Sequence, residues 1–157
     1  MTITAPRMTQ RPPASRADWH TFYVWTPEGR DQADGLIRDV LVPLAGRAVE
    51  EGTVERWFFL RYSEGGLHVR WRLQTTPEFA ETLAAQAGRQ SGLAVTEGTY
   101  QREPERYGGA EHLDRAERVF CASSEIAARL LAERPSSAER LTAAVALVIA
   151  TARGLGL

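Results

Sequence analysis

The sequence is poor in cysteine and histidine, the residues on which disulfides and most structural metal sites depend. A single cysteine, Cys121, excludes an internal disulfide and is typical of a reducing cytoplasm. The three histidines, His20, His68 and His112, are scattered, so a zinc site would need many carboxylate ligands. We therefore expect no metal and no cofactor.

The chain also lacks a long uninterrupted apolar segment. The N-terminus has no apolar core of a signal peptide, and polar residues interrupt the apolar stretch 141–157, which is shorter than a membrane span requires. We expect a cytoplasmic protein that does not enter a membrane. The formal net charge of −1 gives no general attraction to nucleic acid, so any anion binding must be local.

The length and composition fit one globular domain with a substantial core. The chain has 157 residues, of which 43% are hydrophobic and 25% are charged. Residues 1–17 contain three prolines and no aromatic residue, which indicates a disordered N-terminal segment. We expect residues 18–157 to fold as a single domain.

Helical and alternating patterns succeed one another along the rest of the chain. They predict a strand over 19–26, a helix over 31–51 kinked at Pro43, two strands within 54–73, a helix over 76–90 and a strand over 93–100. This β-α-β-β-α-β order is typical of a ferredoxin-like fold of the α+β class. In that fold an antiparallel sheet carries both helices on one face and leaves the other face open.

The two strands within 54–73, VERWFFLRYSEGGLHVRWRL, are expected to form a hairpin. A four-residue turn over 63–66 would pair Tyr62 with Leu67, Arg61 with His68, Phe59 with Arg70 and Trp57 with Arg72. Side chains alternate between the faces of a strand, so one face would be apolar and lie under the helices. Its residues would be Phe58, Leu60, Tyr62, Leu67, Val69 and Trp71. The open, cationic face would carry Trp57, Phe59, Arg61, His68, Arg70 and Arg72.

Two C-terminal helices are expected after the sheet, one over 110–133 and one starting near 135. The apolar stripe of the first would consist of Leu113, Ala116, Phe120, Ala127, Leu130 and Leu131. Residues 141–152 of the second are apolar nearly all round, and such a helix is stable only when it is buried on several sides. We therefore expect a partner protein, a second copy in a homodimer, or further C-terminal sequence to cover the C-terminal helices.

Two polar clusters could carry chemistry. The first is the group Arg61, His68, Arg70 and Arg72, whose guanidiniums would repel one another unless an anion or carboxylates lie among them. Neutralisation by nearby glutamates is the alternative for this cluster, because charged patches on sheets are common. The second is the segment 99–109, TYQREPERYGG, for which a purely structural turn is the alternative.

Spaced motifs in a fixed order resemble a known family. They are WFFLRY (57–62), HVRWRL (68–73), YQREPERYGG (100–109) and AERVF (116–120) with Ser123 and Ser124. The chain resembles the C-terminal domain of lantibiotic dehydratases, which also occurs alone as the thiopeptide-type bacteriocin biosynthesis protein. The resemblance extends from about Trp19 to the end of the chain.

The resemblance implies work on a ribosomally made precursor peptide. In the family, this domain eliminates glutamate from glutamylated Ser or Thr and leaves dehydroalanine or dehydrobutyrine. The family's functional arginines correspond to Arg70, Arg72 and Arg106, which would act in catalysis by holding carboxylates and offsetting enolate charge. The residues expected to bind substrate are Arg61, His68, Arg102 and Tyr107. For His68, a role as a base and a structural role both stay open.

Several alternatives accompany this hypothesis. Family members run on well beyond the length of this chain, and their catalytic histidine lies in that later part. A second chain could supply the remainder, or the protein could bind precursor peptide beside a separate dehydratase without catalysing a reaction. A formal [4+2] cycloaddition between two dehydroalanines, with release of the leader peptide, is a further possibility within the family. An RNA-binding sheet is disfavoured because the RNP1 pattern is absent and the net charge is slightly acidic.

Overall fold

The computed structural model describes residues 17–154, so the predicted disorder of residues 1–16 lies outside the described residues. In chain order the elements are β1 (Asp18–Trp25), α1 (Arg30–Leu36), the π-helical turn η1 (Ile37–Leu41), α2 (Val42–Glu50), β2 (Val54–Tyr62), β3 (His68–Thr75), α3 (Pro77–Ser91), β4 (Val95–Gly98), the 3₁₀ turn η2 (Pro104–Tyr107), α4 (Ala110–Ala132) and α5 (Ser137–Gly154). Among these residues no helix is long and apolar enough to cross a membrane.

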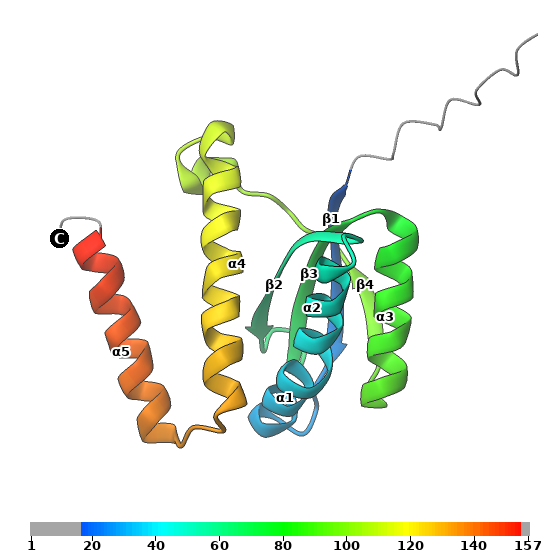
Figure 1. Cartoon of the computed structure of the whole chain (residues 1–157), viewed down its shortest axis with the longest axis horizontal. Helices are drawn as coiled ribbons and strands as arrows, with labels where there is room; N and C mark the ends of the chain where they lie inside the picture. The colour runs from blue at the N-terminus through cyan, green and yellow to red at the C-terminus, as the bar shows by residue number, and fades with distance from the viewer. Residues whose placement is uncertain (1–16, 155–157) are drawn as a thin grey trace, which may run out of the picture.

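The four strands form one antiparallel sheet in the order β2-β3-β1-β4. The α1–η1–α2 segment and α3 cover one face of the sheet, which confirms the predicted ferredoxin-like arrangement (Figure 1). The π-helical turn ends just before Pro43, whose ring removes a backbone donor and disturbs the regular helical ladder. The predicted kink therefore takes the form of a widened helical turn.

The predicted register of the hairpin is wrong by one residue. Tyr62 pairs with His68 and Phe59 with Trp71, so the connection has five residues, 63–67, instead of four. Gly65 and Gly66 both have positive φ, and a Cβ on Gly66 would lie 3.2 Å from the Trp25 ring. The longer loop therefore depends on glycine at this close approach.

The register reverses the two faces that were predicted for β2. Trp57 and Phe59 lie in the core beneath the helices, together with Val69, Trp71 and Leu73 of β3. Residues Phe58, Leu60 and Tyr62 of β2 instead share the open face with the arginines of β3. The assignment for β3 is confirmed for Val69 and Trp71, which are fully buried in the core, whereas Leu67, predicted on the same face, lies in the loop and is 43% exposed.

Helix α4 covers the outer edge of β2, and α5 lies beyond it (Figure 1). At this edge the backbone N–H of Phe59 donates to Oγ of Ser124, 3.1 Å away, which satisfies a group that the sheet leaves unpaired. The buried residues of α4 are Leu113, Glu117, Cys121, Ser124, Ala128 and Leu131. The predicted apolar stripe of α4 is therefore offset around the helix from the side that is buried. Only Leu113 and Leu131 belong to both.

Candidate functional site

A pocket of about 570 Å³ opens on the face of the sheet that the helices leave uncovered. Its walls come from β1, β2 and β3 and from the segment that joins β4 to α4. The lining residues are Tyr23, Leu60, Tyr62, Arg70, Arg72, Thr99, Tyr100, Gln101, Glu103, Arg106 and Tyr107. The pocket thus brings together the three arginines expected to be catalytic.

Arg72 is the most deeply placed of the three. The residue is only 7% exposed, and its guanidinium carbon lies 3.9 Å from the centre of the Tyr100 ring and 5.2 Å from that of Phe58. Within the described residues it has no carboxylate partner, and its buried Nε has no hydrogen-bond acceptor. Burial lowers the pKa of Arg72. Among the described residues, only aromatic rings compensate for the free-energy cost of burying this charge. An anion bound in the pocket would therefore form a strong ion pair with Arg72.

Arg70 lies beside Arg72 with its guanidinium against two tyrosine rings. The distances from the guanidinium carbon are 3.5 Å to the centre of Tyr62 and 5.0 Å to that of Tyr23. Its Nε donates to Nε2 of His68 at 3.2 Å, while Nδ1 of His68 lies 2.7 Å from the carbonyl oxygen of Gly66. Nδ1 of His68 therefore carries the ring proton, and Nε2 of His68 accepts the hydrogen bond that orients Arg70.

Arg106 reaches the same pocket from η2. Its side chain is 69% exposed and forms an ion pair with Glu103 at 2.8 Å, and this hydrogen bond raises the pKa of Arg106. Counting only the lining residues, three guanidiniums face one carboxylate, so the pocket carries a net positive charge. Two of its arginines, Arg70 and Arg72, lack a carboxylate partner among the described residues and can receive an anionic ligand.

The residues predicted to bind substrate divide into two groups. Tyr107 lines the pocket, while His68 lies behind Arg70 and does not line it. Arg61 is on the helix-covered side of the sheet, where it forms an ion pair with the buried Asp34 at 2.6 Å. Its predicted place on the open face is wrong because the hairpin register differs.

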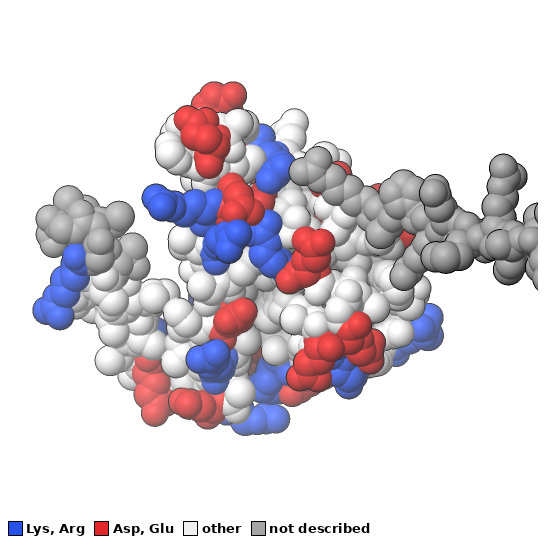
Figure 2. All heavy atoms as spheres, turned by 45° about the horizontal axis from the view of Figure 1, so that its top comes forward, with Lys and Arg blue, Asp and Glu red and all other residues white. Residues whose placement is uncertain are grey.

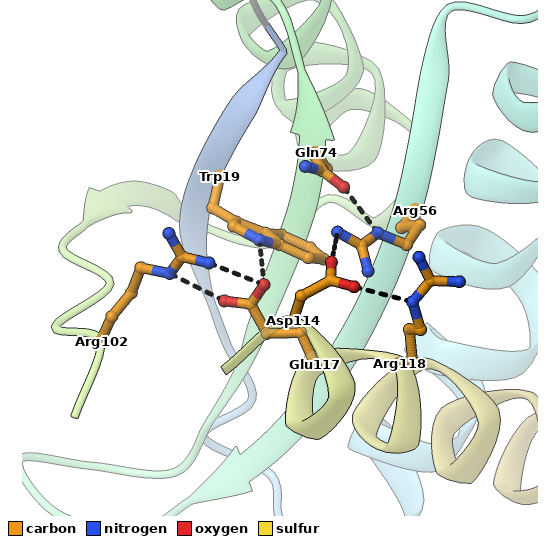
Figure 3. A network of polar contacts seen from close by, with 7 residues as sticks. All are labelled: Trp19, Arg56, Gln74, Arg102, Asp114, Glu117 and Arg118. Atoms are coloured by element: carbon orange, nitrogen blue, oxygen red, sulfur yellow. Dashed lines mark hydrogen bonds and ion pairs between the residues drawn. The ribbon is translucent and has the colours of Figure 1, made fainter. Parts of the chain in front are cut away.

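Arg102 points away from the pocket and binds Glu117 of α4 through two nitrogens, each 2.9 Å from a carboxylate oxygen. Figure 3 shows this pair beside Trp19, and a second group around Asp114. The role of Arg102 in the described structure is to attach the segment after β4 to α4. The charge of Arg102 is thereby neutralised outside the candidate site.

Sequence reasoning missed the aromatic side chains that hold the arginines. Tyr23, Tyr62 and Tyr100 come from three separate segments, and only the fold shows that their rings converge. It also missed Glu117, which is fully buried. The available signal was its position four residues after Leu113, on the buried side of α4.

No group of three or more His, Cys, Asp or Glu side chains within residues 17–154 is arranged to hold a metal ion. Burial raises the pKa of Cys121 to about 11, so its thiol is not activated as a nucleophile near neutral pH. The polar groups that line the pocket belong to its arginines, its tyrosines, Glu103, Thr99 and Gln101.

Comparisons with known proteins agree on one family. A family model described as lantibiotic biosynthesis dehydratase C-term matches residues 19–157. The subtilin biosynthesis protein SpaB of Bacillus subtilis is 36% identical over an alignment of 80 residues, and the match covers 45% of this chain and 8% of SpaB. The nisin biosynthesis protein NisB of Lactococcus lactis subsp. lactis is 34% identical over an alignment of 80 residues, and the match covers 47% of this chain and 8% of NisB.

Two solved structures resemble most of the chain. TsrL superposes with a TM-score of 0.66 at 27% identity, over 82% of this chain and 39% of TsrL. The tRNA-dependent lantibiotic dehydratase MibB from Microbispora sp. 107891 gives a TM-score of 0.61 at 32% identity, over 82% of this chain and 13% of MibB. The chain thus spans less than half of each relative.

Proposed function

Because the chain belongs to the lantibiotic dehydratase C-terminal family, we propose that its pocket holds a glutamylated Ser or Thr of a precursor peptide and promotes elimination of glutamate. The observation that carries this proposal is the buried Arg72, which has no carboxylate partner among the described residues and lies beside Arg70 and Arg106. Such a site is suited to a ligand with more than one carboxylate.

The proposed reaction is a β-elimination. A base removes the proton on Cα, the electron pair forms the Cα–Cβ double bond, and the Cβ–O bond breaks, so that glutamate leaves as a carboxylate. Arg72 and Arg70 would offset the negative charge that develops on the enolate and on the departing carboxylate. Arg106, the more exposed arginine, would hold the free carboxylate of the glutamyl group, the one that is not part of the ester.

The test is intact-mass spectrometry of a glutamylated precursor peptide incubated with the protein. Elimination predicts a product lighter than the substrate by one glutamic acid for each glutamylated residue. An unchanged mass, with the protein alone and with every partner enzyme of the system, would contradict the proposal. A macrocyclic product with release of the leader peptide from a bis-dehydroalanine substrate would instead select cycloaddition.

One observation favours a second candidate, a peptide-binding partner without catalysis of its own. None of the described residues that line the pocket is a histidine, and His68 is engaged with Arg70 and Gly66. In that case a base from another protein would complete the site. Fluorescence anisotropy that shows precursor binding, together with turnover only after a second protein is added, would select this candidate.

We further propose that α5 associates with α5 of a second copy of the chain. Leu141, Val145 and Val148 recur at helical spacing and are 67%, 49% and 68% exposed. Glu139 and Arg153 lie near opposite ends of α5, so an antiparallel pair would place unlike charges opposite each other. Figure 2 shows α5 standing out from the body with a largely uncharged middle.

Val148→Glu is expected to abolish this association, because it places a charge in the middle of the apolar stripe. Sedimentation velocity over a wide concentration range should show a dimer for the unaltered chain and a monomer for the variant. Ala150→Glu is the matched control, since it adds the same charge at an exposed position on the opposite side of α5. A monomer at every concentration for the unaltered chain would overturn the proposal.

A further inference from the structure

Glu117 is a fully buried carboxylate outside the pocket, held by donors from two other segments. Nε1 of Trp19 donates to one oxygen at 3.0 Å, and Arg102 donates to both oxygens at 2.9 Å (Figure 3). Buried charges are costly unless they are paired and hydrogen-bonded, which this one is. The carboxylate thereby connects α4 to the start of β1 and to the segment after β4.

The same carboxylate is connected to the wall of the pocket through Trp19, whose ring contacts Tyr100. Burial raises the pKa of Tyr100 to about 12, and the nearby negative charge of Glu117 adds to the effect. The rings of Trp19 and Tyr100 contact each other edge-on at 6.1 Å, and each also contacts Phe58, at 5.0 and 5.9 Å. Phe58 and Tyr100 are the two rings that lie against Arg72.

We propose that Glu117 is a positioning residue of the pocket: it fixes Trp19, and the Trp19 ring sets Phe58 and Tyr100, the two rings that hold Arg72 in place for an anionic ligand. The inference rests on the proposed function of the pocket as a carboxylate site. Arg72 has no acidic neighbour to orient it among the described residues, so its position depends on aromatic contacts. Glu117 acts on those contacts and not on the ligand.

An alternative role, in which Glu117 only attaches α4 to the rest of the fold, explains these contacts less well. Asp114, one turn earlier on α4, already binds Arg56 of β2 at 2.8 Å and Arg118 at 2.8 Å. An apolar residue at position 117 would attach a helix at least as well, because replacing a buried ion pair by packed apolar groups is often neutral or stabilising. What an apolar residue could not do is accept the Trp19 N–H bond and so set the ring that contacts Phe58 and Tyr100 edge-on.

The experiment measures binding of glutarate, a dianion with two carboxylates and no amine, to the full chain by isothermal titration calorimetry. Glu117→Gln and Trp19→Phe are each expected to weaken binding about tenfold, and the double variant no further, because both changes weaken one connection, the bond from the Trp19 N–H to the Glu117 carboxylate. Asp114→Asn is the matched control and should bind as the unaltered chain does. Additive effects of the two changes, or unchanged binding by Glu117→Gln, would overturn the inference.

An alkaline absorbance titration tests the connection without any ligand. Tyr100 should ionise near pH 12, Tyr100→Phe should remove that step, and Glu117→Gln should shift it to lower pH. The pKa of Tyr100 in the folded state lies above its ordinary value of 10, so the neutral phenol stabilises the fold fully below pH 10 and this stabilisation is lost as the pH rises to 12. Circular dichroism must therefore accompany the titration to show that the chain stays folded. If the unaltered chain binds no glutarate, the proposed function fails. If Glu117→Gln leaves the Tyr100 step in place, the positioning role fails.

Discussion

Arg72→Ala is expected to abolish the loss of glutamate from a glutamylated precursor, with a fall in rate of at least about a hundredfold. Arg72 is the one lining arginine that is nearly fully buried, and it is held by aromatic faces with no carboxylate neighbour among the described residues. The alanine variant removes a positive charge from the least exposed arginine position of the pocket, where electrostatic interactions are strongest. Intact-mass spectrometry at several time points gives the rate.

Two control variants separate charge from geometry in this experiment. Arg72→Lys keeps the positive charge but loses the planar fork, so it should recover only part of the activity. Arg118→Ala removes an exposed arginine that binds Asp114 outside the pocket and should leave the rate unchanged. An Arg72→Ala variant that eliminates glutamate at the unaltered rate would show that the pocket is not the reaction site.

The order of elements was predictable, whereas the register of β2 was not. Helical spacing and strand alternation are local signals, and they placed each helix and strand of the ferredoxin-like unit within a few residues. In β2, however, Trp57, Phe58, Phe59 and Leu60 are all apolar, so either face could be buried. The loop length decides between them, and it depends on the close approach of Gly66 to Trp25, a contact that exists only in the folded sheet.

The positions of the β3 arginines could be predicted from the sequence. The ion pairs between residues that lie far apart in the sequence could not. Arg70 and Arg72 alternate with Val69 and Trp71, so their common open face follows from strand geometry. Arg61 and Arg102 belong to the neighbouring motifs WFFLRY and YQREPERYGG, yet each is bound by a buried carboxylate on a helix, Asp34 or Glu117. Which arginines stay available to a ligand is therefore decided by long-range packing.

Asp34→Ala is expected to lower the free energy of unfolding by about 3 kcal/mol, because breaking a buried ion pair leaves its partners uncompensated. The Asp34 side chain is 4% exposed and binds both Arg61 of β2 and Arg140 of α5. Burial lowers the pKa of Arg61, and the nearby positive charge of Arg140 adds to this effect, so the two guanidiniums would repel each other once the carboxylate is gone. Urea unfolding followed by circular dichroism measures the change.

The control for this prediction is Asp39→Ala, which removes a carboxylate from the adjoining helical turn. Asp39 is half exposed and pairs with its sequence neighbour Arg38, so water can replace the lost carboxylate and its loss should change stability little. A double variant, Asp34→Leu with Arg61→Met, should recover stability relative to Asp34→Ala, because it also removes the partly buried cation. If Asp34→Ala and Asp39→Ala unfold at the same urea concentration, Asp34 does not join α5 and β2 to the body of the fold in the way that the structure indicates.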